Sequence, residues 1–305
     1  MNRAKKRGVG EIFPFLLMAG LIILIDGLAL SVISPFEAAG MSVFENPDDP
    51  LNIVYLFLTI LVFTAAILLI SKFLKKILVQ GIILVAVGFV SFSVFYPLLA
   101  AVFSELWSVS LSMAATAVLV VMLVKYPEWY VIDTSSIIVG AGSIAMLGIS
   151  LNILLVIVLL IGLAVYDAIS VYKTKHMIDL ADTVLELRSP IMLVIPKIRN
   201  YSQMKETRSL KEELREGEER KAFLMGLGDF VFPGILVAST FYNITNNGLL
   251  IALSVMLGTL LGFTPLAVHV SRGKPQAGLP YLCSGAILGY IVSSYLLFGQ
   301  LVGLT

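Results

Sequence analysis

Nine long apolar stretches follow one another along this chain of 305 residues, each about as long as a helix that crosses a bilayer. Hydrophobic residues make up 58% of the sequence and charged residues only 13%, which is far from the composition of a soluble domain. Because lipid offers no partners for backbone N–H and C=O groups, such stretches are expected to form helices. The sequence therefore predicts an all-α, multi-pass integral membrane protein with nine transmembrane helices.

Short polar turns separate most of the predicted spans, and one long polar segment divides the chain. The spans cover about residues 13–33, 52–70, 77–95, 107–124, 131–149, 153–172, 222–242, 249–270 and 278–302. The long segment follows the sixth span. It predicts three parts: a six-helix part at residues 1–175, a loop at 176–221, and a three-helix part at 222–305.

The basic residues provide an independent check on the number of spans. With nine spans and the N-terminus inside, all 21 Lys and Arg fall in the N-terminal segment or in loops on the same side. One missed or invented span would destroy this agreement with the positive-inside rule. We therefore expect a cytoplasmic N-terminus and an outside C-terminus. The first span runs past Asp26 without a signal-peptide cleavage pattern, so we expect it to be retained.

The long loop contains one apolar stretch, at residues 189–198, which includes Pro190 and Pro196 and is too short to span a membrane. We expect it at the membrane interface or against the helices, where a role as a plug or as an autocleavage segment stays open. Residues 202–221 alternate acids and bases, which is typical of a solvated helix or a linker.

Two aspartates interrupt consecutive apolar spans, Asp167 in the sixth and Asp229 in the seventh. A charged Asp at the bilayer centre costs roughly 2.5 to 3.5 kcal/mol on insertion scales, so such residues are usually paired or functional. Helix rise places each of them about 9 to 12 Å from the same membrane edge, at nearly equal depth. If the two antiparallel spans pack together, with Gly226 and Gly228 allowing a close approach, the carboxyl groups face each other.

Two facing carboxyl groups suit an aspartyl protease. They do not both ionise easily, so the pair is expected to share one proton near neutrality. One carboxylate takes a proton from the attacking water, while the other group polarises the peptide carbonyl and later protonates the leaving amine. The alternatives are a buried polar pair that holds helices together, and a proton- or cation-coupled secondary transporter. Transporters usually contain internal repeats, and none is evident here.

Three motifs give this chain a family resemblance. Tyr166-Asp167, the run Gly226-Leu227-Gly228-Asp229 and the run Gln276-Ala277-Gly278-Leu279-Pro280 resemble the YD, GxGD and PAL motifs of presenilin and signal peptide peptidase, the intramembrane aspartyl proteases. The likeness extends to the nine spans and the long loop, so it covers essentially the whole chain. The third motif departs from PAL, although its leucine and the following proline are retained. The inside N-terminus matches presenilin.

The resemblance implies hydrolysis of peptide bonds in transmembrane segments. It implies catalytic roles for Asp167 and Asp229, and a substrate-binding site formed by Tyr166, Gly226, Leu227, Gly228, Ala277, Gly278, Leu279 and Pro280. A substrate helix must unwind before its carbonyl groups can be attacked, and its extended backbone then needs hydrogen-bond partners. We expect the segment beside Pro280, or the end of the long loop, to offer an edge for strand addition.

The remaining polar residues carry weaker signals. Asp26 is expected to make a local hydrogen bond to a neighbouring helix, and Asp133 to be solvated at the interface. With His176, His269 and Cys283 as the only histidines and cysteine, zinc-protease and serine-protease chemistry lack their residues. We therefore expect no metal and no cofactor.

The expected partners are transmembrane-helix substrates and the lipid bilayer, and not nucleic acid. The need for accessory subunits, homo-oligomerisation and the possibility of an inactive scaffold stay open. Gly140, Gly142 and Gly148 in the fifth span are expected to let neighbouring helices approach closely.

Overall fold

The computed structural model describes residues 9–73, 76–174, 192–197, 201–203, 222–270 and 276–304. Within these ranges it contains nine α-helices, which confirms the predicted all-α architecture. They are α1 (Val9–Ala38), α2 (Leu51–Phe73), α3 (Lys76–Ala100), α4 (Glu105–Lys125), α5 (Trp129–Ser150), α6 (Ile153–Ile169), α9 (Leu227–Asn243), α10 (Gly248–Val270) and α11 (Leu279–Phe298).

Seven of these helices are long and apolar enough to cross a membrane, by length and composition, where α6 counts with its helical continuation to Tyr172. The other two are α2, with 23 residues, and α9, with only 17. The helix of the seventh span was expected to begin at Ala222, but residues 222–226 form a strand instead. A strand rises about 3.3 Å per residue and a helix about 1.5 Å, so strand and helix together reach farther than one helix of the same length.

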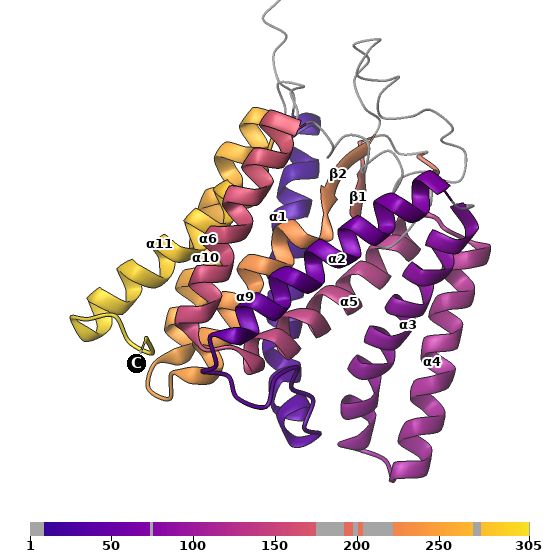
Figure 1. Cartoon of the computed structure of the whole chain (residues 1–305), viewed down its shortest axis with the longest axis horizontal. Helices are drawn as coiled ribbons and strands as arrows, with labels where there is room; N and C mark the ends of the chain where they lie inside the picture. Colours follow the sequence, from indigo (N-terminus) through magenta and orange to yellow (C-terminus); the bar gives the residue numbers. More distant parts are fainter. Residues whose placement is uncertain are drawn as a thin grey trace, which may run out of the picture.

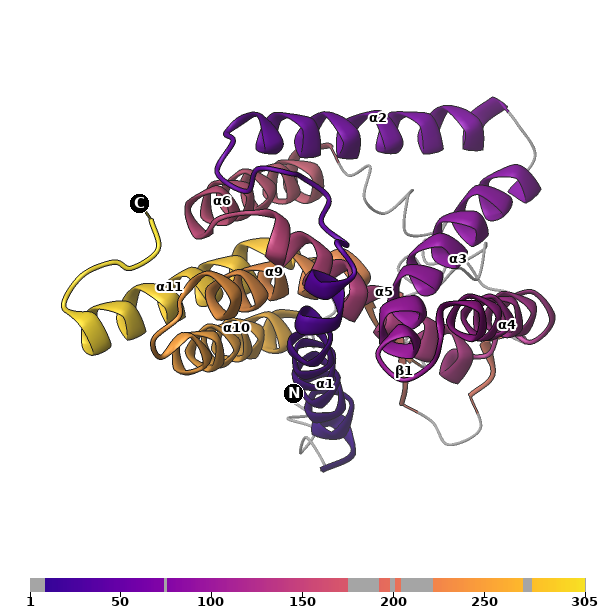
Figure 2. The same cartoon turned by 90° about the horizontal axis from the view of Figure 1, so that it is seen from below.

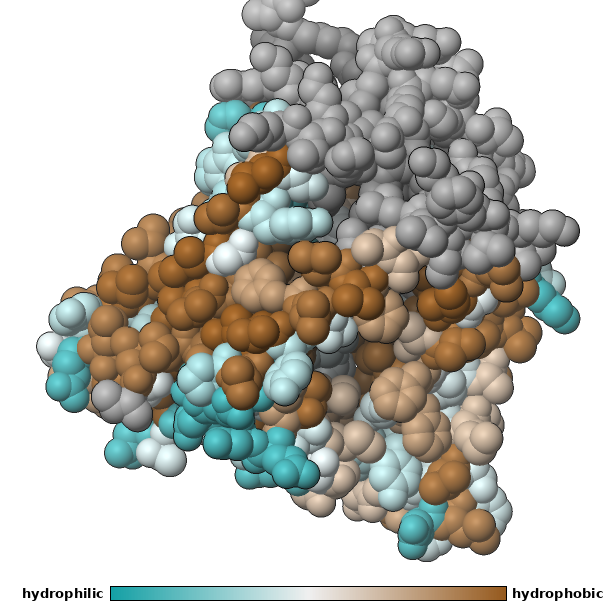
Figure 3. Space-filling view, viewed as in Figure 1, coloured by the Kyte–Doolittle hydropathy of each residue, from teal (hydrophilic) through white to brown (hydrophobic). Residues whose placement is uncertain are grey.

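The helices form three groups (Figures 1 and 2). Helices α1, α5 and α9 pack together in the centre, α3 and α4 form a pair on one side, and α6, α10 and α11 lie on the other. Helix α2 crosses the outer side of the molecule near α6. Figure 3 shows a broad hydrophobic belt across the helices, with hydrophilic residues below it. This surface is the one expected of a protein embedded in lipid.

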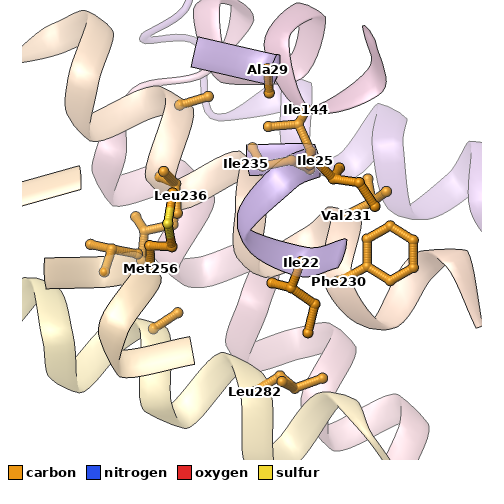
Figure 4. Packing of buried hydrophobic residues seen from close by; sticks show 14 of the residues in the cluster. Ile22, Ile25, Ala29, Ile144, Phe230, Val231, Ile235, Leu236, Met256 and Leu282 are labelled. Carbon is orange, nitrogen blue, oxygen red and sulfur yellow. The ribbon is translucent and has the colours of Figure 1, made fainter. Parts of the chain in front are cut away.

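The core forms where the central helices meet α10 and α11. Figure 4 shows its side chains, among them Ile22, Ile25, Ile144, Phe230, Ile235, Met256 and Leu282. Small residues bring the helices together, as predicted for α5. A Cβ at Gly148 would lie 2.3 Å from the Ala238 Cβ of α9, and one at Gly142 would lie 2.2 Å from a methyl group of Val94 in α3. Neither distance is compatible with a side chain, so these positions require glycine.

The structure contains two short strands at positions where the sequence predicted none, although the end of the long loop was expected to offer an edge for strand addition. Strand β1 (Met192–Pro196) pairs antiparallel with β2 (Ala222–Gly226), with Val194 opposite Leu224. Strand β1 lies within the apolar stretch 189–198. It packs against α5, which agrees with one of the two expected locations, the one against the helices. Five-residue apolar runs carry too little periodicity to reveal a strand.

Strand β2 leads directly into α9, so the hairpin lies next to the start of that helix (Figure 1). The three-part division of the chain stays a prediction, as does the membrane orientation. His176 and most of the charged run at 202–221 lie outside the described residues.

Candidate active site

Asp167 lies near the end of α6, and its side chain is only 3% exposed. The backbone N–H of Leu279 donates a hydrogen bond to its Oδ2 at 3.1 Å, and the N–H of Gly278 contributes a second one. Both donors belong to the start of α11, where N–H groups have no partners within the helix. The start of α11 therefore fixes the position of this carboxyl group.

Asp229 is the third residue of α9 and is partly exposed. Its carboxylate accepts a hydrogen bond from the backbone N–H of Gly226, the residue that caps the helix. An acidic residue at the third helical position reaches back in this way in a capping box. Gly226 at the N-cap and Asp229 three residues later thus cap the start of α9. The Asp229 carboxylate turns back toward β2.

Gly278 is the point at which the two aspartates meet. A Cβ on Gly278 would lie 2.9 Å from both Cγ and Oδ2 of Asp229, closer than side chains pack. Asp229 therefore contacts the same residue whose N–H binds Asp167. The two carboxyl groups are close enough to interact electrostatically. Segments separated by more than a hundred residues of sequence converge here.

The glycines expected to allow this approach act differently. A Cβ at Gly226 would contact Asp229 of its own segment at an ordinary 3.5 Å, and a Cβ at Gly228 would meet Phe232 at 3.2 Å. Helix α6 does pack against α9, as predicted. However, the glycine that gives a neighbouring element access to an aspartate is Gly278, on α11.

The other predicted site residues surround this point unevenly. Tyr166 is 50% exposed on α6, whereas Ala277 is fully buried and Leu279 nearly so. Pro280 is partly buried in the first turn of α11, where its fixed backbone angle suits a helix start. Leu227 is partly buried at the start of α9. The start of α11 thus meets Asp167 through the backbone N–H of Leu279.

Two features near the aspartates carried no sequence signal. Cys283 is buried one turn after Leu279. The Tyr172 hydroxyl donates to Gln276 Oε1 at 2.9 Å. Tyr172 belongs to η1 (Ser170–Thr174), a turn of π-helix that directly follows α6, so this bond ties the chain after Asp167 to the segment before α11.

The expectation for Asp133 was wrong. Its side chain is only 7% exposed, and its Oδ1 accepts a hydrogen bond of 2.7 Å from the Val194 N–H of β1. Asp26, expected to hydrogen-bond a neighbouring helix, instead lies against α9. A Cβ at Gly234 would be 2.7 Å from its Oδ1, and no hydrogen bond to Asp26 occurs among the described residues.

Among the residues that the structure describes, the hairpin has one occupied edge and one open edge. Val194 N–H bonds Asp133, and the Met192 carbonyl accepts from Ser136, so both backbone groups point away from β2. Because backbone groups alternate in an antiparallel pair, the odd-numbered residues of β1 bond β2. The outward groups of β2 are then those of Ala222, Leu224 and Gly226.

The last of these outward groups, the Gly226 N–H, bonds the Asp229 carboxylate. The open edge of β2 therefore leads directly to Asp229. Among the described residues, no hydrogen bond reaches the outward groups of Ala222 or Leu224.

Comparisons with known proteins bear on the function of this chain. Residues 19–299 match a family model described as "Signal-peptide peptidase, presenilin aspartyl protease". Two crystal structures of a presenilin-family intramembrane aspartate protease, in different crystal forms, are similar to this chain. They show 30% and 31% sequence identity and TM-scores of 0.67 and 0.68, and each match covers 93% of this chain and 98% of the other. No curated protein sequence matched. These findings point to proteolysis and not to transport.

Proposed function

The chain belongs to the signal-peptide peptidase and presenilin family of aspartyl proteases and is an intramembrane aspartic endopeptidase, and from this we propose that Asp167 and Asp229 are its catalytic dyad. The observation that carries the proposal is the contact of both carboxyl groups with Gly278 at the start of α11. Two carboxyl groups at one point are the minimum that general acid and base catalysis of peptide hydrolysis needs.

The dyad acts on a peptide carbonyl together with one water molecule. One carboxylate takes a proton from the water as its oxygen attacks, and the protonated partner stabilises the developing negative charge on the carbonyl oxygen. The proton then moves to the leaving amine, and the peptide bond breaks. The N–H groups of Gly278 and Leu279 hold the Asp167 carboxyl group at the start of α11. Because the pair shares a proton, the two roles belong to the dyad as a unit.

The substrates are transmembrane segments of other proteins or peptides, and the unwound segment adds to the open edge of β2. Leu224 and Ala222 supply the N–H and C=O groups that an extended backbone requires inside a membrane. A substrate strand on this edge passes Asp229, because the neighbouring Gly226 N–H bonds that carboxylate. The edge of β1 is occupied by α5, so β2 is the edge that receives the substrate.

Cleavage of a purified single-span reporter tests the dyad. We expect Asp167→Asn and Asp229→Asn each to lower kcat at least about 100-fold, because each removes one partner of the acid–base pair. Asp26→Asn is the matched control, since it also neutralises an intramembrane carboxyl group but lies against Gly234. Cleavage that survives both dyad substitutions, or that Asp26→Asn abolishes equally, would contradict the assignment.

Backbone modification of the substrate tests strand addition. We would replace successive amides of a single-span peptide by N-methyl amides, each of which removes one N–H donor. Only every second N–H of an added strand points to β2, so KM should rise about fivefold at alternate positions and little between them. Sensitivity without this alternation would reject strand addition and leave the dyad untouched.

A further inference from the structure

Helix α5 closes the outer edge of β1 with two side chains. Asp133 accepts from the Val194 N–H at 2.7 Å, and the Ser136 hydroxyl donates to the Met192 carbonyl at 3.1 Å. Both side chains are buried, at 7% and 0% exposure. A buried N–H bonded to an ionisable acceptor forms a strong, geometrically defined contact. Strand β1 is therefore held by α5 on one edge and by β2 on the other.

The same helix holds the chain that follows β1. The Glu128 carboxylate, at the N-cap of α5, accepts from the Ser202 hydroxyl at 2.7 Å and from the Gln203 N–H at 3.0 Å. The segment on the far side of the strand is thus fixed to the same helix. These contacts distinguish α5 from a helix that only packs against the hairpin.

The contact face of α5 continues to the start of α9. Asp133, Ser136 and Gly140 are spaced three and four residues apart, so they lie along one face of the helix. A Cβ at Gly140 would meet Phe230 at 3.3 Å and Leu227 at 3.5 Å. These two residues bracket Asp229 in the sequence. One face of α5 therefore contacts first the hairpin and then the turn that carries the aspartate.

We propose that Asp133 and Ser136 are positioning residues that dock β1 on α5 and thereby set the place of the β2 edge relative to Asp229. The two strands move as one unit because their ladder joins them, and β2 continues into α9 without a linker. Loss of these two hydrogen bonds lets the hairpin shift along α5. The bound substrate strand then shifts relative to the dyad, which weakens its binding and spreads the cleavage over neighbouring bonds. This inference rests on the proposed addition of the substrate to β2.

Two matched pairs of variants test the proposal in the full-length protein. Ser136→Ala removes a hydrogen bond to β1, whereas Ser135→Ala removes one of similar length, 2.9 Å, to Val131 of α5 itself. Asp133→Leu removes the acceptor for Val194, whereas Asp133→Asn keeps a carbonyl oxygen in the same place. We expect KM for the reporter to rise about tenfold for Asp133→Leu and about fivefold for Ser136→Ala, and to stay within about twofold for the two controls.

Two further readouts separate docking from general stability. Mass spectrometry of the products should show cleavage at additional bonds only for Ser136→Ala and Asp133→Leu. Amide hydrogen exchange should rise in residues 192–197 of Asp133→Leu and stay unchanged in Asp133→Asn. A fall in the amount of active enzyme at constant KM and constant cleavage sites would show a structural role only, and would overturn the proposal.

The exchange measurement also separates this inference from the proposed function. Amide exchange in β1 can rise in Asp133→Leu while KM and the cleavage sites stay unchanged. This result would mean that α5 docks the hairpin but that the hairpin does not position substrate. Equal KM defects in Asp133→Asn and Asp133→Leu, with unchanged exchange, would mean that the charge of Asp133 matters and not its contact with Val194.

Discussion

At the residue scale, Gly278 decides how the two aspartates meet. Its N–H binds Asp167, and its missing side chain leaves room for the carboxylate of Asp229. The PAL pattern has alanine at this position, so the departure from that pattern lies where a Cβ would come within 2.9 Å of the Asp229 carboxylate. The lack of a Cβ matters here because the neighbouring atom belongs to a proposed catalytic group.

Substitution of Gly278 by alanine should therefore lower activity more than stability. The added Cβ would lie 2.9 Å from the Asp229 carboxylate and must push it aside, and misplacement of a catalytic group by about 1 Å costs up to about 100-fold in rate. We expect kcat to fall at least about tenfold, with little change in thermal unfolding.

Gly20→Ala in α1 is the control, because no atom lies within 4 Å of a Cβ at that position. This variant should keep full activity and gain slightly in stability, since alanine is the better helix former. Full activity of Gly278→Ala would show that the carboxylate adapts to the alanine found in the family pattern.

At the element scale, α10 and α11 touch through backbone atoms. A Cβ at Gly258 would lie 2.2 Å from the Gly285 carbonyl oxygen, one at Gly262 would lie 2.3 Å from that of Tyr281, and one at Gly289 would lie 2.4 Å from that of Ser254. Glycines four residues apart on each helix form this contact, as small residues do in membrane helix pairs. The contact fixes α11, whose first N–H groups bind Asp167.

Gly258→Ala should force α10 and α11 apart along this contact. Overpacking costs about 1 to 3 kcal/mol, so we expect a lower melting temperature in detergent. Because α11 also carries Gly278 and Leu279, we expect cleavage of the reporter to fall in the same variant at temperatures below its melting transition. Gly27→Ala, at a position with open space, should lower neither property. Normal stability and activity of Gly258→Ala would contradict the close contact.

At the scale of the whole molecule, charge sets the expected orientation in the membrane. The positive-inside rule places the turn between α4 and α5 in the cytoplasm and the segment between α1 and α2 outside. Tyr126 and Ser42 are exposed in these two segments. Cysteines introduced there provide a direct measurement of topology.

In intact cells, a membrane-impermeant maleimide should label Ser42→Cys, and Tyr126→Cys should react only after permeabilisation. The native Cys283 is 1% exposed and provides an unreactive background, so it does not need to be removed. The opposite labelling pattern would invert the orientation and place the N-terminus outside.

The sequence by itself determined the all-α architecture of this protein and predicted its chemistry. The number of helices follows from apolar length, because a bilayer requires about 20 residues per span. The aspartates are evident because a carboxyl group in an apolar span is rare and has a high energetic cost. The expectation for Asp133 was wrong for a different reason. A residue near a helix end usually reaches solvent, and only a segment distant in sequence can bury it.

Tertiary structure decided how these parts meet. Three contacts join residues far apart in sequence: the pairing of β1 with β2, the hydrogen bond from Val194 to Asp133, and the contact of Gly278 with Asp229. Helix periodicity reports only neighbours within a few residues, so it carries no record of such contacts. A strand of five apolar residues becomes recognisable only when a partner satisfies its backbone hydrogen bonds. The sequence therefore predicts the reacting groups, and the packing of α5, α9 and α11 defines the surroundings in which they lie.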